Sequence, residues 1–398
     1  MSEFYALIVN AGSSSLKLAV INAHSGQQEF SVLAQRIGTE EAVLDIAFAD
    51  QKLSLACPQA SVAGALQEAW NVYEQQDDLP MIQAVGHRVV HGGELFQESI
   101  LIDHQVLLGI EECSALAPLH NPANLDGIQA SLSLLPSIPH VAVFDTAFHH
   151  TMKPHAYLYA VPYAWYQEHA VRRYGFHGSS HRYVAEECAK RLQRDDLQLL
   201  TAHLGNGCSA CAIRAGQSVD TTMGLTPLEG LMMGTRSGDV DPQLHSMLAQ
   251  RTGWTLDKIT SDLTKKSGLL GVSGISNDMR SLSEARERGS TQASLAIDLF
   301  CYRVAKGLLG ISASLDRVDA VVFTGGIGEN SPDVRSRVVS HLKVLGAEIS
   351  SGTNEVHGRN SQGNLSPEST QGPAIMVIPT NEELMIARET LASVVSSL

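Results

Sequence analysis

A short turn near the N-terminus has residue types that suit binding of a phosphate group. Asn10-Ala11-Gly12-Ser13-Ser14-Ser15 joins two apolar runs, and Lys17 lies in the second of them. Small residues let backbone N–H groups approach phosphate oxygens, serine hydroxyls add donors, and a lysine adds a point charge. An ordinary tight hairpin needs the same small residues, so this turn by itself leaves both interpretations open.

A second turn of the same kind, His203-Leu204-Gly205-Asn206-Gly207, lies between two further apolar runs. Two such turns, one from each half of the chain, suit a nucleotide whose phosphates they hold. The common nucleotide motifs are absent from the sequence. Gly230–Ser237, the nearest candidate for a P-loop, has no lysine, and the turn predicted at Thr324–Asn330 is followed by Ser331 where a dinucleotide fingerprint needs its third glycine. The sequence therefore predicts a nucleotide site of another kind.

Three arginines stand in glycine-flanked loops: Arg88 in Gly86–Gly93, Arg173 in Arg172–Gly178, and Arg236 in Met233–Asp239. Arginine suits a bidentate contact with carboxylate or phosphoryl oxygens. The formal net charge is -14, so a local cluster of cations must attract any anionic substrate that the overall field repels. The three loops predict an anion pocket, and ordinary surface ion pairs are the alternative interpretation.

Two carboxylates are candidates for a magnesium site. Asp145 ends a predicted buried strand at Val141–Asp145, where open α/β sheets usually bind ligands. Glu382 lies at the start of a predicted helix, where it also complements the helix dipole. Such oxygen ligands suit Mg²⁺ held mostly by water and phosphates. Zinc is not predicted at Cys208-Ser209-Ala210-Cys211, which has no second cysteine pair, or at His177-Gly178-Ser179-Ser180-His181, which lacks the metalloprotease glutamate.

The elements that position these residues alternate between strand and helix patterns, which predicts an α/β protein. The strands Tyr5–Val9 and Leu16–Ile21 flank the first turn, and Leu197–His203 and Ser209–Ile213 repeat this layout around the second. The repetition predicts a duplicated architecture, with one domain at 1–150 and a second at 151–383. The polar stretch Ser351–Gly372 is predicted to be a surface excursion, and Thr380–Glu383 to open a C-terminal helix.

Composition narrows the classes of protein. The 398 residues are 44% apolar and 18% charged, as in globular proteins. The acidic balance argues against nucleic acid as a partner, and no apolar run approaches the roughly 18 residues of a membrane helix. Six scattered cysteines and a non-basic start at Met1–Phe4 are typical of a cytoplasmic protein.

Taken in order, the motifs closely resemble the acetate kinase family over nearly the whole chain: Asn10–Lys17, Gly86–Gly93, Phe144–Phe148, Arg173–Gly178, His203–Gly207, Met233–Asp239, Gly325–Asn330 and Pro379–Glu383. The resemblance implies two duplicated actin-like domains, of the ribonuclease H-like and sugar-kinase-like fold, with a nucleotide cleft between them. It implies Mg²⁺-dependent, reversible transfer of a phosphoryl group from ATP to acetate, giving ADP and acetyl phosphate, with Mn²⁺ able to replace Mg²⁺. It also implies a homodimer whose C-terminal helix, 384–398, packs back on the first domain.

The resemblance also assigns roles residue by residue. Arg88 would bind acetate, with Val90, Leu119 and Phe176 lining the methyl pocket, and Asp145, His177 and Arg236 would be catalytic. Asn10 and Glu382 would hold the metal. The nucleotide contacts would be Lys17, His203, Leu204, Gly205, Asn206, Gly207, Asp278, Met279, Arg280, Gly326, Ile327, Gly328, Glu329 and Asn330.

Direct in-line transfer is the expected mechanism, with Mg²⁺, His177 and Arg236 neutralising charge on the phosphoryl oxygens. A carboxylate acceptor is already ionised near neutral pH, because carboxyl pKa values lie near ~4. Asp145 is therefore interpreted as an organiser of Mg²⁺ or water and not primarily as a general base.

Three alternatives stay open. A propionate or butyrate kinase is the closest, although Val90 beside Arg88 favours a small pocket. A non-catalytic ATPase scaffold of the same fold would not need Arg88, Val90, His177 and Arg236. A sugar kinase would need polar sugar contacts where this chain has arginine and apolar side chains.

Overall fold

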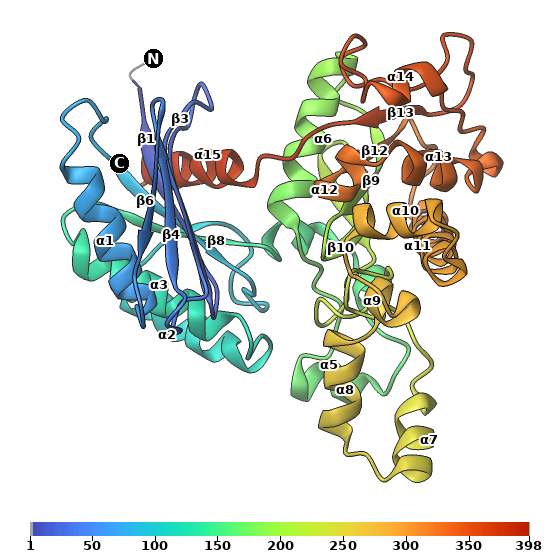
Figure 1. Ribbon diagram of the computed structural model, residues 1–398, viewed down its shortest axis with the longest axis horizontal. Helices are drawn as coiled ribbons and strands as arrows, with labels where there is room; N and C mark the ends of the chain where they lie inside the picture. The colour runs from blue at the N-terminus through green and yellow to red at the C-terminus, as the bar shows by residue number, and fades with distance from the viewer. Residues whose placement is uncertain (1–2, 398) are drawn as a thin grey trace. The chain divides into compact units, whose positions relative to one another are not determined.

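The computed structural model of the chain describes residues 3–397 (Figure 1). The chain divides into two compact units. Unit 1 consists of Met1–Phe148 together with Asn381–Leu398, and unit 2 of His149–Thr380. Each unit has its own sheet.

Unit 1 contains an eight-stranded sheet in the order β5-β4-β3-β2-β1-β6-β8-β7. Its strands are β1 (Tyr5–Ala11), β2 (Ser15–Asn22), β3 (Gln28–Gln35), β4 (Val43–Phe48), β5 (Gln51–Ala56), β6 (Ala84–Val89), β7 (Ile100–Leu101) and β8 (His140–Phe144). β1 to β5 form an antiparallel meander, and β6 and β8 continue the sheet parallel to β1.

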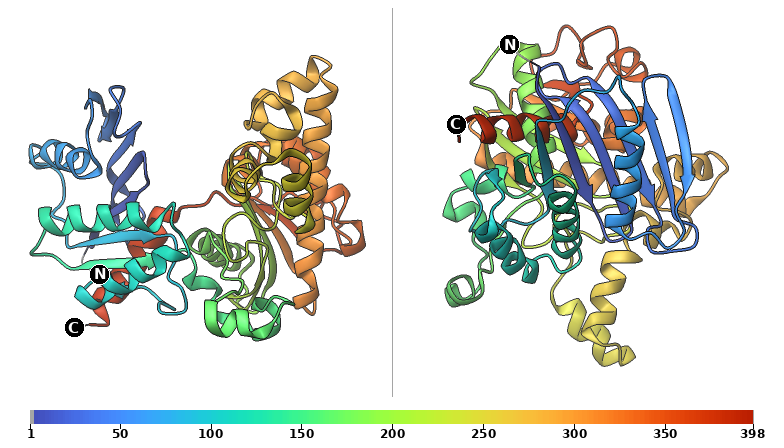
Figure 2. Two further views of the ribbon diagram at one scale, coloured as in Figure 1. Left: turned by 90° about the horizontal axis from the view of Figure 1, so that it is seen from below. Right: turned by 90° about the vertical axis from the view of Figure 1, so that its left-hand side faces the viewer.

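Helices cover both faces of the parallel part of this sheet. α1 (Val62–Glu74) and α3 (Asn121–Leu134) pack on one face, and α15 (Glu382–Val395) packs on the other, against β1, β6 and β8 (Figure 2). Gly86 in β6 allows the close approach of α15, because a Cβ there would lie 2.3 Å from Thr390 Oγ1 and 2.9 Å from Ile386 Cγ2. The same face of β6 therefore carries Gly86 and, two residues on, Arg88.

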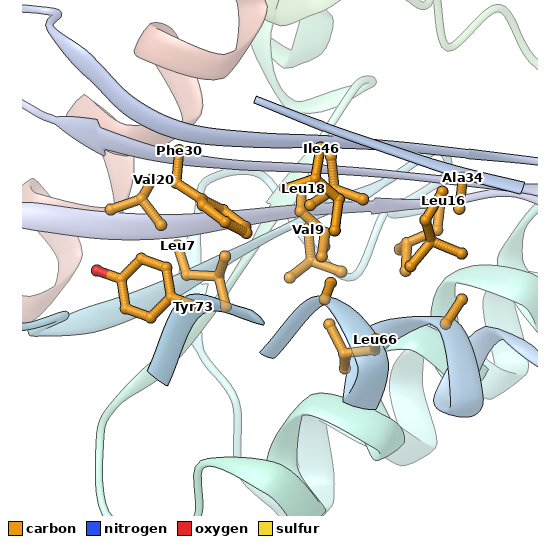
Figure 3. Close-up of a cluster of buried hydrophobic side chains, with 14 of the residues drawn as sticks. Leu7, Val9, Leu16, Leu18, Val20, Phe30, Ala34, Ile46, Leu66 and Tyr73 are labelled. Atoms are coloured by element: carbon orange, nitrogen blue, oxygen red, sulfur yellow. The ribbon is translucent and has the colours of Figure 1, made fainter. Parts of the chain in front are cut away.

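The core of unit 1 lies between the sheet and α1 with α3. Alternate residues of β1 and β2 point into it, including Leu7, Val9, Leu18 and Val20 (Figure 3). Leu66 and Tyr73 of α1 close the cluster from the helix side. The period of two in the strands thus leaves Ile8 and Asn10 on the α15 face, the same face as Arg88.

Unit 2 contains a five-stranded sheet in the order β11-β10-β9-β12-β13. The strands are β9 (Gln198–Leu204), β10 (Cys208–Arg214), β11 (Gln217–Thr221), β12 (Ala320–Thr324) and β13 (Ala374–Val377). Every residue of β9 is buried, because α6 (Gly178–Leu192) and α11 (Thr291–Ile311) both pack against it. Such two-sided cover is typical of parallel strands.

The remaining helices of the two units are mostly short. They are α2 (His104–Glu112), α4 (Pro154–Tyr157), α5 (Tyr163–His169), α7 (Gln243–Thr252), α8 (Leu256–Lys265), α9 (Gly268–Ser273), α10 (Met279–Glu287), α12 (Gly325–Asn330), α13 (Pro332–Ser340) and α14 (Ser351–Glu355), with 3₁₀ turns at Cys113–Ala115, Ala147–Thr151, Ser312–Ser314 and Lys343–Leu345. Within residues 3–397, no helix is long and apolar enough to cross a membrane.

The two sheets share one topology. In unit 1 the order β3-β2-β1-β6-β8 joins an antiparallel meander of three strands to two parallel strands, and β11-β10-β9-β12-β13 repeats it in unit 2. β4, β5 and β7 are additions at the edges of the first sheet. This repetition confirms the predicted α/β class and the predicted duplication of architecture.

One prediction about unit 2 was wrong, and a second was incomplete. Thr324–Asn330 is not an open turn, because Gly325–Asn330 forms α12. Ser351–Gly372 is not merely a surface excursion, because it begins with α14 and buries Asn354 and Leu365. Both departures have the same cause, the buried Arg335, which donates to the carbonyls of Gly328 and Glu329 and to Asn354.

Candidate functional site

In unit 1 the site residues are grouped around Arg88, near the end of β6. Its Nε donates to Asp145 Oδ1 at 3.0 Å and its Nη2 to Asp145 Oδ2 at 2.6 Å. The Asp145 side chain is 2% exposed and that of Arg88 24% exposed. Asp145 follows β8, the parallel neighbour of β6, and its backbone N–H donates to the Val89 carbonyl at 3.0 Å. A buried carboxylate therefore holds the guanidinium by one edge.

The Nη1 and Nη2 edge of the Arg88 guanidinium keeps N–H groups that do not contact Asp145. Arg88 Nη1 lies 3.3 Å from Asn10 Oδ1, at the end of β1. A guanidinium has five N–H groups, and the contacts with Asp145 and Asn10 use three of them. One N–H on each of Nη1 and Nη2 is left, and two such donors suit the two oxygens of a second carboxylate.

Lys17 and Glu382 are linked to this group through the start of α15. Lys17 Nζ forms an ion pair with Glu383. The pKa of the Glu382 carboxyl is raised to about 7, first by burial and then by the negative charges of Asp145 and Glu383, while Arg88 and Lys17 act to lower it. The structure thus brings Asn10, Lys17, Arg88, Asp145 and Glu382 together within unit 1, as an electrostatically coupled set.

The fit of this set to a divalent cation can be judged from its charges. Burial, and after it the charges of Asp145 and Glu383, raise the pKa of Glu382, and a cation would relieve the repulsion among these carboxylates. Within residues 3–397, however, no three His, Cys, Asp or Glu side chains converge as a metal-binding cluster. The residues fit Mg²⁺ held by one or two carboxylates and otherwise by water and phosphates, and they do not form an all-protein cage.

The predicted methyl-pocket residues have different surroundings. Val90 is 6% exposed, and its backbone N–H donates to Asn124 Oδ1 at 3.0 Å, so its position beside Arg88 is fixed. Leu119 is 63% exposed, and Phe176, in unit 2, is 1% exposed.

In unit 2 the turn after β9 packs directly on the loop that carries Arg236. Gly234 donates its N–H to the Asn206 carbonyl at 3.0 Å, and a Cβ on Gly234 would lie 2.2 Å from Asn206 Oδ1. Gly205 N–H donates to the Gly207 carbonyl at 3.0 Å within the turn. Only a glycine at position 234 allows the two loops to meet, and this contact was not predicted.

His177 and Arg236 converge beside Gly207. A Cβ on Gly207 would lie 3.5 Å from His177 Nε2 and 3.5 Å from Arg236 Nη1. The His177 ring also stacks on the His203 ring, with centroids 4.3 Å apart. His177 precedes α6 in a left-handed backbone conformation, with φ of 57°, which is a strained state for a residue with a Cβ.

Arg236 is a half-buried cation without a carboxylate partner among residues 3–397. Its Nη1 donates to the Pro227 carbonyl at 3.2 Å, and burial lowers the pKa of its guanidinium. A desolvated charge is costly unless it is paired, so an unpaired arginine beside small-residue turns indicates an anion site.

The third predicted arginine, in the loop Arg172–Gly178, does not belong to such a site. Arg173 Nη2 pairs with Glu229 Oε1 at 2.7 Å, and its Nη1 donates to the carbonyls of Thr222 and Met223. The Arg172 guanidinium lies over the Tyr157 ring, 3.7 Å from its centroid. The prediction of an anion pocket built from three loops was therefore wrong for the two arginines of this loop, which hold the fold.

α12 carries Gly326, Ile327, Gly328, Glu329 and Asn330, and side chains fix both of its ends. Glu329 Oε1 accepts from the backbone N–H of Gly325 at 2.9 Å and from that of Thr380 at 3.1 Å. At the other end the fully buried Arg335 donates to the carbonyls of Gly328 and Glu329, each at 2.8 Å, and to Asn354. Arg335 thereby also explains why Asn354 and α14 are drawn into the structure.

The segment Asp278–Arg280 opens α10. Asp278 is the N-cap, and its Oδ2 accepts from the N–H and the hydroxyl of Ser281, each at 2.8 Å. Met279 is buried at 5% exposure, so its side chain belongs to the core. Arg280 is exposed, which leaves its side chain available to a ligand.

A buried histidine holds the segment before His177. His149 Nε2 lies 3.0 Å from the Phe176 carbonyl and its Nδ1 lies 2.8 Å from Ser218 Oγ. A Cβ on Gly175 would lie 2.6 Å from His149 Cδ2. The pKa of His149 is lowered to about 4, chiefly by burial.

This lowered pKa predicts a loss of stability in acid. His149 is neutral in the folded chain, whereas in the unfolded chain it takes up a proton near its ordinary pKa of 6.5. The free energy of unfolding is therefore unaffected by His149 above pH 6.5. As the pH falls towards 4, it decreases by about 3 kcal/mol at most. We expect the urea midpoint to fall between pH 7 and 4.5, and to fall less steeply in His149→Gln; equal slopes would contradict the assignment.

Two sheets with the same five-strand order, each with a small-residue turn after its first strand, define a duplicated α/β protein of the ribonuclease H-like class. Comparison with known proteins gives the family. The Acetokinase family profile matches residues 5–388. The chain is 52% identical to the acetate kinase of Deinococcus radiodurans, with 97% of each chain covered, and 51% identical to that of Ectopseudomonas mendocina, with 98% of this chain and 99% of the relative covered.

Solved structures agree with the family profile. A propionate kinase of Francisella tularensis is 44% identical with a TM-score of 0.93, and Porphyromonas gingivalis acetate kinase is 39% identical with a TM-score of 0.91. Each comparison covers 98% of this chain and 100% of the other. The chain belongs to the acetokinase family.

Proposed function

We propose that this protein transfers the γ-phosphoryl group of ATP to acetate, reversibly and with Mg²⁺, giving acetyl phosphate and ADP. The observation that carries the proposal is the state of Arg88, which Asp145 holds by one edge while the Nη1 and Nη2 edge keeps free donors. A carboxylate fits those donors, and buried Val90 beside them limits the length of the acid. Relatives about half identical are named acetate kinase, which supports the same acceptor.

In this mechanism Arg88 fixes the carboxylate so that one of its oxygens faces the phosphorus atom. Arg236 and His177 neutralise charge on the transferring phosphoryl group, which is the main requirement of such a reaction. The acetate oxygen attacks and the ADP oxygen leaves in line, and no proton has to be removed from the acceptor. Asp145 is bidentate to Arg88, which supports the interpretation that it is not primarily a general base and gives it the further role of orienting Arg88.

The nucleotide is assigned to Lys17, the turn His203–Gly207, the start of α10 at Asp278–Arg280, and α12 residues Gly326–Asn330. Asn10 and Glu382 would hold Mg²⁺, with Asp145 acting through water. When bound, the ion would supply positive charge to the phosphate oxygens. The homodimer and the cytoplasmic location are further parts of the proposal, and light scattering of the purified protein tests the first of them.

The direct experiment is trapping of the product. Incubation with Mg·ATP, acetate and hydroxylamine should give acetohydroxamate, and omission of acetate should give none. ATP hydrolysis without hydroxamate would favour the ATPase scaffold, and phosphorylation of a sugar would favour the sugar kinase. Either result would contradict the proposed acetate kinase activity.

Propionate is the second candidate acceptor, because a solved relative with 44% identity is a propionate kinase. One methylene in an apolar pocket discriminates by about 1–3 kcal/mol, so acetate should lead propionate by roughly 10- to 100-fold in kcat/KM. Equal values for acetate, propionate and butyrate would defeat the acetate assignment.

Val90→Ala is expected to shift the preference toward propionate. Removing two methyl-sized groups from a buried position makes room for one methylene. We expect kcat/KM for propionate to rise about tenfold relative to acetate, as measured with both acids on one preparation. Leu119→Ala, at a 63% exposed position, is the matched comparison, and a larger shift there would assign the pocket to Leu119 instead.

A further inference from the structure

A chain of buried hydrogen bonds begins at His177 and runs into unit 2 between α6 and the sheet. His177 Nδ1 lies 2.9 Å from Ser209 Oγ, and the same oxygen lies 2.7 Å from His181 Nε2. His181 Nδ1 then lies 2.8 Å from Thr201 Oγ1, which donates to the Cys211 carbonyl at 3.3 Å. His177 is the N-cap of α6 and His181 lies in the first turn of the helix, and both rings reach the one hydroxyl of Ser209.

The inner members of this chain are shielded from water. Thr201, His181 and Ser209 are each 0% exposed. Thr201 and Ser209 lie on neighbouring strands, and the pairs Ser209↔His203 and Cys211↔Thr201 place their side chains on the α6 face. Burial lowers the pKa of His181 well below its ordinary value, helped by His149 and His203, so its ring is neutral and has one donor and one acceptor nitrogen.

The direction of the chain follows from its inner end. Thr201 gives its only hydroxyl proton to the Cys211 carbonyl, so its oxygen accepts from His181 Nδ1–H. His181 Nε2 is then an acceptor, and it receives the proton of Ser209. With that proton used, Ser209 Oγ can only accept from His177, which places a proton on His177 Nδ1.

We infer that Ser209, His181 and Thr201 are positioning residues that hold His177 with a proton on Nδ1 and with its Nε2 edge turned to Gly207 and Arg236. This inference rests on the proposed function, in which His177 contacts the transferring phosphoryl group. The strained backbone at His177 and the stacking of its ring on His203 also restrict the position of the ring. Within that position the ring can take two flipped orientations, and the hydrogen bond to Ser209 selects one of them.

Ser209→Ala tests the inference. We expect kcat to fall about tenfold, the worth of one buried hydrogen bond, while KM for acetate and for ATP stays within about twofold. The ¹⁵N signals of His177 should also change from the pattern of an Nδ1-protonated ring toward a mixture of tautomers. Ser131→Ala is the matched control, because this buried serine donates to the Gly127 carbonyl at 2.8 Å in unit 1 and should leave kcat and the His177 signals unchanged.

Thr201→Val is a second variant, because it keeps the shape of the side chain and removes the hydroxyl that sets the direction of the chain. It should alter the His177 signals in the same sense as Ser209→Ala. Unchanged kcat and unchanged ¹⁵N signals in both variants would overturn the inference. His177→Ala separates this inference from the proposed function. If kcat falls in His177→Ala but not in Ser209→Ala, only the positioning role is wrong. Full activity in His177→Ala would instead contradict the role of His177 in the proposed function.

Discussion

Arg88→Ala should lower kcat/KM for acetate by roughly 10²- to 10⁴-fold, because the variant loses two charge-assisted hydrogen bonds to the acid, each worth about 1.5–3 kcal/mol. The same change should destabilise unit 1. Asp145 is 2% exposed and its carboxylate is held by Arg88, and leaving a buried charge without its partner costs about 3–5 kcal/mol. Steady-state kinetics on acetate and urea unfolding measure the two effects.

The two effects can be separated by removing both charges. In Arg88→Met with Asp145→Leu, a buried ion pair is replaced by apolar side chains of similar volume, a change that is often neutral for stability. We expect this double variant to unfold close to the wild-type urea midpoint and still to lack activity on acetate. Arg88→Lys keeps the charge and loses the planar fork, so it should be intermediate. An Arg88→Met, Asp145→Leu variant with a normal KM for acetate would show that Arg88 does not bind the acid.

The sequence predicted the strands that carry the site because their hydrophobic patterns are strong. β1, β2, β9 and β10 lie within one or two residues of the predicted segments, and the turns between them are where glycine and serine placed them. Nearest-neighbour order in a sheet is harder to predict than strand position, since it depends on non-local pairing. β6 and β8 could be expected beside β1 only through the topology that the resemblance implied.

Contacts between distant side chains were beyond prediction. Arg88 and Asp145 were assigned to separate roles, and nothing in their local sequence shows that the carboxylate holds the guanidinium by one edge. The pairing of Lys17 with Glu383 likewise depends on α15 lying against β1 and β2. The His177–His181 spacing was considered only for zinc, although the same spacing lets both rings share Ser209.

The helix α12 shows how a tertiary contact overrides local propensity. Gly325, Gly326 and Gly328 make the segment a poor helix former, which favoured a turn. Glu329 satisfies the N–H of Gly325, and Arg335 satisfies the carbonyls of Gly328 and Glu329. A buried arginine without a carboxylate partner in its hydrogen bonds is rare, so sequence reasoning gave no ground to expect it at position 335.

Arg236→Ala should lower kcat by about 10³- to 10⁵-fold, the range seen when an arginine that stabilises a phosphoryl-transfer transition state is removed. The expected effect of this substitution on stability and on KM differs from that of Arg88→Ala. Among residues 3–397 Arg236 has no carboxylate partner and donates to the Pro227 carbonyl, so its loss leaves no buried charge behind. The urea midpoint should stay at or above the wild-type value, because a desolvated cation is removed, and KM for acetate should change by only a few-fold.

The contrast with matched variants decides the role of Arg236. Arg236→Lys retains a point charge without the fork and should recover part of the lost kcat, whereas Arg251→Ala, at an exposed arginine of α7, should change neither rate nor stability. If Arg236→Ala instead raised KM for acetate as strongly as Arg88→Ala and left kcat intact, Arg236 would belong to the acid site. An unpaired arginine is costly to keep in a folded protein, and a large kcat loss without a loss of stability is the result that a catalytic use of that charge requires.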